Sequence, residues 1–465
     1  MLIFQKYIIL IKVKVKGCSD TMFREFDYDN KPVVDIVNEI IEDSIKKGAS
    51  DIHFDPDEKC INVRIRIDGE LHDYCRVPDS VRKNLSTRIK IISGMNITEF
   101  RLPQDGAIKH LDGGKQLDLR VSSLPTIYGE KIVIRILDYT MSLAGLDTLG
   151  FSEHNLNLVK RVIASPNGII LTAGATGSGK STTTYSILQK LNTPERNIIT
   201  VEDPVEMKMK GLNQVQVMSE IGLDFNTTLR SILRQDPDII MIGEIRDGET
   251  ARIAVRASIT GHLVLSTIHT NNSLNTIERL LDMDIERYLH GTALHGVISQ
   301  RLVKRICPKC RKSRPTTPYE KNLFKKVLNK DVEAIYEPVG CDDCFGGYRG
   351  RLAVHEVLVL NQDVRDAITN NMRKDDLRRL VYDKKNTFTI LEDGLEKVIL
   401  GLTTLDEIIR ITSLEDDFGA DDEEIKNAFI GNDLNVKLDA KEEKTAEDIK
   451  KEELETVHQD IIDTL

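Results

Sequence analysis

Hydrophobic positions follow two different periods within the first 140 residues of the chain. From residue 32 to residue 48, aliphatic side chains recur every three to four positions, which predicts a helix with one buried face. Residues 61–67 and 130–137 instead alternate between apolar and polar positions, the period of half-buried strands. Asp68 and Gly69, directly after the first of these runs, are typical of a hairpin turn. Residues 31–142 are therefore expected to form a small α+β domain.

The same criteria predict the other elements of this domain. They are strands at residues 51–54 and 116–121, a helix at residues 81–93 and a turn-rich loop at residues 101–106. None of these residue types demands chemistry by itself, and the arginines on the strands fit a solvated face.

A different pattern begins after a glycine-punctuated linker at residues 143–150. Apolar runs long enough for buried strands now alternate with helical stretches, which indicates a parallel sheet with helical crossovers. The runs lie at residues 169–171, 197–201, 237–242 and 262–268. Ligands of such sheets bind beyond the carboxyl ends of the strands. We expect a nucleotide-binding core over residues 151–300.

The first of these strands leads into a phosphate-binding loop. Residues 174–181 read G-A-T-G-S-G-K-S, which fits the G-x-x-x-x-G-K-[ST] motif in its proper context of strand, loop and helix. Its backbone N–H groups and the start of the helix would surround an anion. The alternative interpretation of this stretch is an ordinary glycine-rich turn. Lys180 is suited to the β- and γ-phosphates of ATP, and Ser181 to Mg²⁺. The candidate nucleotide-binding residues are Gly174, Ala175, Thr176, Gly177, Ser178, Gly179, Lys180, Ser181 and Thr182.

Acidic residues and a histidine follow the neighbouring strands. Glu202 follows the second run, Glu244 the third, and His269 the fourth. Glu202 and Glu244 suit contacts to metal and water, and His269 could contact the γ-phosphate. Each carboxylate alone also fits a helix cap or the protein surface. Glu244 stands where the Walker B motif of nucleotide hydrolases usually has an aspartate. The sequence therefore leaves open which of the two carboxylates holds Mg²⁺.

Four of the seven cysteines form two C-x-x-C pairs. Cys307 and Cys310 make the first, and Cys341 and Cys344 the second. Four thiolates can close a structural Zn²⁺ site, here around a helical insert at residues 318–329 within a module at residues 301–355. Redox activity and zinc-ribbon binding of nucleic acid are the alternatives. The other cysteines are expected to be reduced thiols, as in a reducing cytoplasm.

Charge is unevenly distributed along the 465 residues. Residues 414–465 hold 18 Asp or Glu against 6 Lys or Arg, a net charge of −12; since the whole chain carries −10, the rest carries +2. A nearly neutral body does not favour direct binding of nucleic acid. The acidic segment is expected to be a disordered tail after a helical region at residues 356–413. Residues 1–30 form an N-terminal extension that fits neither a signal peptide nor a membrane span, and Met22 could be the true start.

Several motifs together resemble the secretion ATPases that drive type II secretion and the assembly of type IV pili or competence pseudopili. The resemblance covers about residues 32–412. It rests on ASDIHFDP (49–56), RIRIDGEL (64–71), RLPQDG (101–106), DLRVSSLPT (118–126), GATGSGKSTT (174–183), ITVEDPVE (199–206), LRSILRQDPDIIMIGEIRD (229–247) and GHLVLSTIHTN (261–271).

The resemblance implies an α/β fold: a RecA-like P-loop core, a preceding PAS-like α+β domain and the tetracysteine module. It implies a cytoplasmic homo-hexamer that hydrolyses ATP and works through an inner-membrane platform protein, in the short pilus- or competence-type form. Glu202 matches the residue that acts on water and Glu244 the one that acts on Mg²⁺. Arg101 and Arg120 match arginines near the phosphates. Arginines of subunit contacts and coupling are matched by Arg230, Arg234 and Arg246.

Three other functions are weighed against this one. The cysteine pairs argue against a retraction or conjugation motor, because retraction motors of this family generally lack them. The nearly neutral body argues against a zinc-containing nucleic-acid-binding ATPase. The intact set of Lys180, Ser181, Glu202 and Glu244 argues against a scaffold that does not hydrolyse ATP.

Overall fold

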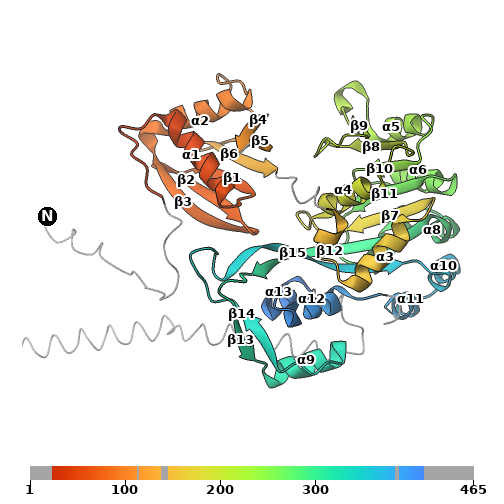
Figure 1. The fold of residues 1–465 in the computed structure, drawn as a ribbon. Helices are drawn as coiled ribbons and strands as arrows, with labels where there is room; N and C mark the ends of the chain where they lie inside the picture. The colour runs from red at the N-terminus through yellow and green to blue at the C-terminus, as the bar shows by residue number, and fades with distance from the viewer. Residues whose placement is uncertain (1–23, 113–114, 138–144, 383–386, 413–465) are drawn as a thin grey trace, which may run out of the picture. The chain divides into compact units, whose positions relative to one another are not determined.

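A computed structural model describes residues 24–112, 115–137, 145–382 and 387–412 (Figure 1). Most of the predicted N-terminal extension, the candidate start at Met22, the beginning of the predicted linker and the acidic tail lie outside the described residues.

The N-terminal domain is a six-stranded sheet with two helices on one face (Figure 1). The strand order is β3-β2-β1-β6-β5-β4, and every neighbouring pair is antiparallel. The elements are α1 (Val33–Lys46), β1 (Asp51–Pro56), β2 (Cys60–Ile67), β3 (Glu70–Pro78), α2 (Asp79–Ser93), β4 (Gln104–Asp112), β5 (Lys115–Thr126) and β6 (Gly129–Leu137). The predicted helices and strands are confirmed.

Two strands of this sheet were not predicted. The loop expected at residues 101–106 is wrong in its second half, because β4 begins at Gln104 and pairs with Ser123 of β5. β3 was missed because its register shifts opposite Val63 and Arg64, so that Tyr74 and Cys75 are both buried. An irregularity of this kind removes the period-two alternation by which a strand is recognised.

The C-terminal part is built on a seven-stranded sheet of order β15-β12-β7-β11-β10-β8-β9. The strands from β12 to β9 in this order are parallel, which confirms the parallel sheet expected from the four apolar runs. At the edge of the sheet, β15 runs antiparallel to β12, and this strand was not predicted. The strands are β7 (Gly168–Ala173), β8 (Ile198–Glu202), β9 (Asn213–Gln216), β10 (Ile239–Ile242), β11 (Leu263–Ile268), β12 (Leu294–Ile306) and β15 (Tyr348–Val359).

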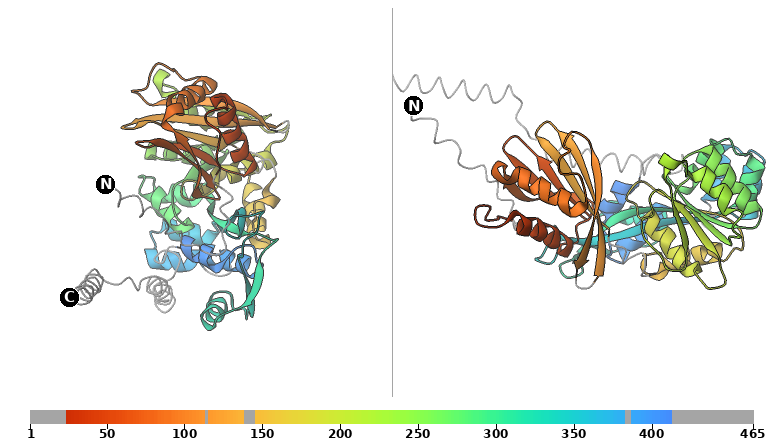
Figure 2. Two further views of the ribbon diagram at one scale, coloured as in Figure 1. Left: turned by 90° about the vertical axis from the view of Figure 1, so that its left-hand side faces the viewer. Right: turned by 90° about the horizontal axis from the view of Figure 1, so that it is seen from above.

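Helices cover both faces of this sheet (Figure 2). On one face lie α3 (Glu153–Ile163) and α4 (Lys180–Leu191). The other face packs against α5 (Phe225–Ile232), α6 (Gly248–Ile259), α7 (Ser273–Leu281), α8 (Arg287–Ala293), α10 (Gln362–Thr369) and α11 (Lys374–Val381). All residues of β7, β8, β10 and β11 are buried, as expected for parallel strands between two helical layers.

The cysteine module connects the ends of the two longest strands of the sheet, β12 and β15. Between β12 and β15 lie the hairpin strands β13 (Lys312–Pro315) and β14 (Ala334–Glu337), with the predicted helix α9 (Pro318–Leu328) between them. The domain limits predicted at residues 300 and 355 therefore fall inside strands. Two further helices, α12 (Ile390–Ile399) and α13 (Leu405–Ile411), lie within the predicted helical region.

Candidate functional site

The phosphate loop connects β7 to α4, and its glycines are needed where they stand. At Gly174, with φ +155°, a Cβ would lie 2.4 Å from Ser178 Oγ and 2.6 Å from the Gln300 carbonyl oxygen. At Gly179, with φ +90°, a Cβ would lie 2.9 Å from Gln300 Nε2. Because any larger side chain would collide there, the loop backbone can stay close-packed against β12 while its N–H groups remain available to an anion.

Lys180 is the first residue of α4 and is 9 % exposed. Its ammonium donates hydrogen bonds to the carbonyl oxygens of Gly174 at 2.7 Å and Ala175 at 3.0 Å. Burial lowers the pKa of Lys180, while the carboxylates of Glu244 and Glu206 oppose that shift. The side chain is thus a positive charge held within the loop, in position to meet a phosphate.

The predicted residues meet around one cavity. The cavity is lined by six residues of the phosphate loop and the first turn of α4: Thr176, Gly177, Gly179, Lys180, Ser181 and Thr182. The strand ends contribute Glu202, Glu244 and His269 to the same lining. β8, β10 and β11 are neighbours in the sheet, so their carboxyl ends bring these three side chains to the same edge. Among the other predicted loop residues, Gly174 and Ala175 bind the Lys180 ammonium, and Ser178 is buried.

Glu244 contacts two side chains at this edge. One oxygen pairs with the guanidinium of Arg246, and the other lies 3.4 Å from His269 Nε2. Ion pairing with Glu244 raises the pKa of Arg246. A carboxylate in such contacts can bind a cation or water if the arginine, which is largely exposed, moves away.

Glu202 lies in a different environment. It is 3 % exposed, and both of its carboxylate oxygens accept hydrogen bonds from neighbouring side chains. Glu202 is therefore the more rigidly held of the two acids.

The other predicted arginines lie outside the cavity lining. Arg101 is 82 % exposed and pairs with Glu99, while Arg120 on β5 donates a hydrogen bond to the Val205 carbonyl oxygen at 3.1 Å. Arg230 pairs with Glu249 at 2.7 Å, and Arg234 donates to the Arg230 carbonyl oxygen at 2.7 Å. Arg246, the fifth arginine named from the resemblance, instead contacts Glu244 at the edge of the sheet. The roles assigned to these arginines stay predictions.

Gln300 supports the phosphate loop and was not predicted from the sequence. Its amide donates to the Ser178 carbonyl oxygen at 2.7 Å and accepts from Thr183 Oγ1 at 2.6 Å. Gln300 lies on β12, far from the loop in sequence, and no local motif marks it. Arg351 of β15 also lines the cavity without having been predicted.

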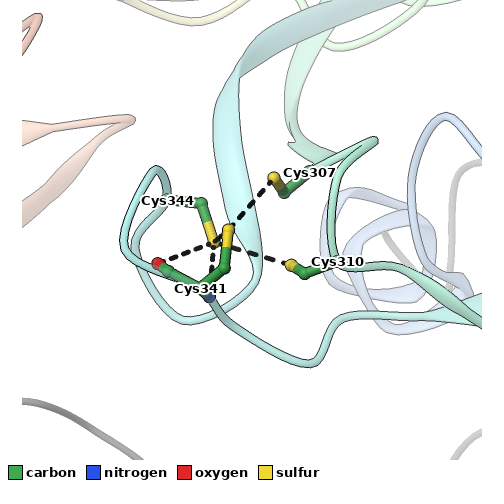
Figure 3. A group of neighbouring side chains, drawn as sticks. All are labelled: Cys307, Cys310, Cys341 and Cys344. Atoms are coloured by element: carbon green, nitrogen blue, oxygen red, sulfur yellow. Dashed lines mark hydrogen bonds between the residues drawn. The ribbon is translucent and has the colours of Figure 1, made fainter.

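The four paired cysteines come together in a second site (Figure 3). Their sulfur atoms all lie within 4.8 Å of one another. Sγ–Sγ distances are 3.9 Å for Cys307–Cys341, 3.7 Å for Cys310–Cys344 and 3.6 Å for Cys341–Cys344. Ligands on a tetrahedral Zn²⁺ with bonds of about 2.3 Å are separated by about 3.8 Å, so the donor set fits zinc.

Backbone groups also point at these sulfurs. The N–H of Gly340 donates to Cys310 Sγ at 3.3 Å, and the N–H of Cys341 donates to Cys344 Sγ at 3.2 Å. Such contacts stabilise thiolates, the form that binds metal. The cluster closes the base of the module, because Cys307 and Cys310 follow β12 whereas Cys341 and Cys344 precede β15.

A glycine-rich loop between a buried parallel strand and a helix, with acids at the adjacent strand ends, defines a P-loop nucleotide hydrolase. The comparisons with known proteins agree. A family model described as "Type II/IV secretion system protein" matches residues 27–410, and the chain belongs to that family. It is an ATPase of the type II secretion and type IV pilus assembly group.

The chain is similar to several curated proteins. It is 46 % identical over 383 residues to the putative type II secretion system protein E of Escherichia coli, covering 82 % of this chain and 77 % of that protein. It is 45 % identical over 390 residues to the type IV pilus assembly ATPase PilB of Myxococcus xanthus, covering 83 % of this chain and 69 % of that protein. These matches confirm the predicted family.

Solved structures share the fold. The Legionella pneumophila ATPase DotB superposes with a TM-score of 0.63 at 22 % identity, covering 84 % of this chain and 98 % of that one. The pilus retraction motor PilT with bound ADP superposes with a TM-score of 0.56 at 25 % identity, again covering 84 % of this chain and 98 % of that one. In the part of the chain that the structure describes, no helix has both the length and the hydrophobicity needed to cross a bilayer.

Proposed function

We propose that this chain is a Mg²⁺-dependent motor ATPase that powers the assembly of a type IV pilus, a type II secretion pseudopilus or a competence pseudopilus. The observation that carries the proposal is the meeting of Lys180, Glu202, Glu244 and His269 around one cavity at the carboxyl edge of a parallel sheet. Hydrolysis of ATP needs phosphate binding, charge neutralisation and an oriented water, and these side chains offer groups for all three.

Each side chain has a separate task in this proposal. The N–H groups of the loop and the Lys180 ammonium bind the β- and γ-phosphates of ATP. The Ser181 hydroxyl and the Glu244 carboxylate would hold Mg²⁺, which neutralises charge on the phosphate oxygens when bound. Glu202 orients and polarises the attacking water, and His269 contacts the γ-phosphate. Arg246 leaves Glu244 when nucleotide enters.

The mechanical output needs partners. We infer a homo-hexamer in the cytoplasm, attached to the inner face of the cytoplasmic membrane through a platform protein and without direct contact to nucleic acid. In this motor, Arg101 and Arg120 of the N-terminal domain would approach the phosphates of bound ATP, and Arg230 and Arg234 act in subunit contacts. Relatives named for type II secretion and for pilus assembly support this proposal, since their identities of 42–46 % exceed the 25 % of the retraction motor.

The four-cysteine cluster supports the assembly branch over a retraction motor or a conjugation-type secretion ATPase. Cys307, Cys310, Cys341 and Cys344 would hold a structural Zn²⁺, which closes the loop between β12 and β15. The closed set of four sulfur ligands argues against catalysis at the metal, because a catalytic zinc keeps an open position.

The system that the motor serves can be identified genetically. Deleting the gene and scoring surface filaments, secreted protein and DNA uptake in the same strain should abolish at least one of them. Complementation with the wild-type gene should restore it, whereas complementation with Lys180→Ala should not. A strain that keeps all three activities would contradict the proposal.

Replacing Glu244 with glutamine tests the acidic residue that follows β10 and lines the cavity. The E244Q protein is expected to lose about 100-fold or more in kcat, because a neutral amide is a poor ligand for Mg²⁺ and leaves Arg246 and His269 without their shared anion. Steady-state release of phosphate measures the change. Glu153→Gln is the matched control, since Glu153 is an exposed residue in the first turn of α3 and lies outside the cavity lining. Equal rates in the two variants would remove Glu244 from the mechanism.

A further inference from the structure

A buried tyrosine on the helix of the phosphate loop contacts the carboxylate of Glu202. Tyr185 lies one turn beyond Ser181 on α4, is 2 % exposed, and donates its phenolic hydrogen to Glu202 Oε2. Both side chains also line the nucleotide cavity. The hydroxyl thus joins the helix that follows the phosphate loop directly to the acid at the end of β8.

The other oxygen of Glu202 is held separately. Oε1 accepts a hydrogen bond from Thr200 Oγ1 at 2.6 Å and another from Gln214 Nε2 at 3.3 Å. Gln214 is itself fixed, because its amide donates to the Met207 carbonyl oxygen at 2.9 Å and accepts from the Met209 N–H at 2.8 Å. The Glu202 side chain is therefore held by α4, β8 and β9 together.

Counting acceptor positions shows which oxygen can still bind water. An ionised carboxylate has about four lone-pair positions, two on each oxygen. Thr200 and Gln214 take both positions of Oε1, whereas Tyr185 takes one position of Oε2. Among the described residues no further donor to Oε2 is found, so the remaining acceptor position belongs to the oxygen that Tyr185 orients.

We propose that Tyr185 is a positioning residue for hydrolysis: it holds Oε2 of Glu202 so that the free lone pair of that oxygen accepts a hydrogen bond from the attacking water. The inference rests on the proposed function of Glu202. Burial and the adjacent Glu202 charge raise the pKa of Tyr185, so its hydroxyl remains a donor at neutral pH. A helix that shifts when the loop binds phosphate would move this hydroxyl, and with it the carboxylate.

Tyr185→Phe tests the proposal because it keeps the ring, which packs in the core between α3, α4 and the sheet, and removes only the hydroxyl. We expect kcat for ATP to fall about tenfold or more, the usual effect of losing one hydrogen bond to a charged group. KM for ATP and the affinity for ADP should change less than twofold. Tyr288→Phe, at an exposed tyrosine of α8, is the matched control and should change neither quantity.

A double-mutant cycle separates this inference from the function on which it rests. If Glu202→Gln alone lowers kcat strongly, Glu202 has its proposed role, and adding Tyr185→Phe to it should lower kcat no further. Independent, multiplicative losses from the two changes would overturn the positioning role. So would an unchanged kcat in Tyr185→Phe, or a rise in KM that matches the fall in kcat. If Glu202→Gln leaves kcat unchanged, the assignment of Glu202 fails first.

Thr200→Val provides a second variant in case Tyr185→Phe is poorly folded. It removes the shorter of the two hydrogen bonds to Oε1 and leaves Oε2 with Tyr185. A fall in kcat with unchanged KM, smaller than that expected for Tyr185→Phe, would support an orientation role for the whole network. A loss as large as that of Glu202→Gln would contradict the special place given to Oε2.

Discussion

Replacing Lys180 with alanine should reduce ATP hydrolysis at least about 1000-fold. The Lys180 ammonium is the cation held within the phosphate loop, and its loss leaves the charge that develops on the γ-phosphate oxygens without that partner. Purified protein assayed for phosphate release would show turnover near background. Binding of ATP should weaken as well, since the same charge acts on the ground state.

The protein itself should remain folded after this change. Burial works against the charged form of Lys180, so the neutral alanine removes a cost as well as two hydrogen bonds to backbone carbonyls. The melting temperature should therefore stay within a few degrees of the wild type. Lys190→Ala is the matched control, because Lys190 lies exposed at the other end of the same helix. Near-normal hydrolysis by Lys180→Ala would refute the assignment of this site.

Local motifs allowed much of this site to be predicted. The loop from Gly174 to Ser181 needs only its own residues to be recognised, because the glycines, the lysine and the helix start are contiguous. Glu202, Glu244 and His269 could be placed at one edge because neighbouring parallel strands end on the same side of a sheet. The two cysteine pairs could be joined because four thiolates need one another to bind zinc.

What could not be predicted depends on contacts between distant segments. Gln300 supports the loop from a strand more than a hundred residues away, and its own neighbours in sequence give no indication of it. The antiparallel β15 was missed because its pairing with β12 spans the whole cysteine module. The burial of Glu202 against Tyr185 likewise results from the packing of α4 against the sheet, which a sequence pattern does not specify.

Replacing Cys310 with serine should remove the metal that we propose for the cysteine module. A site with three thiolates and a hydroxyl binds Zn²⁺ far more weakly, since the hydroxyl is not deprotonated at neutral pH. Wild-type protein is expected to contain about one zinc per chain by elemental analysis, and the variant close to none. Thermal unfolding should begin at least about 5 °C lower, because metal binding to a preformed site contributes several kcal/mol and each kcal/mol shifts Tm by about 2–4 °C in a domain of this size.

The loss should be local to the module. Without the metal, the only covalent connection between the ends of β12 and β15 is the long segment through β13, α9 and β14, and that segment should become the first point of cleavage by a protease. Cys60→Ser is the matched control, because Cys60 is a partly exposed residue of β2 whose sulfur lies 3.7 Å from Asn62 Oδ1 and outside the cluster. It should keep its zinc and its resistance to cleavage. Wild-type protein without zinc, or a Cys310→Ser protein that retains it, would show that the four sulfurs lie close together for another reason.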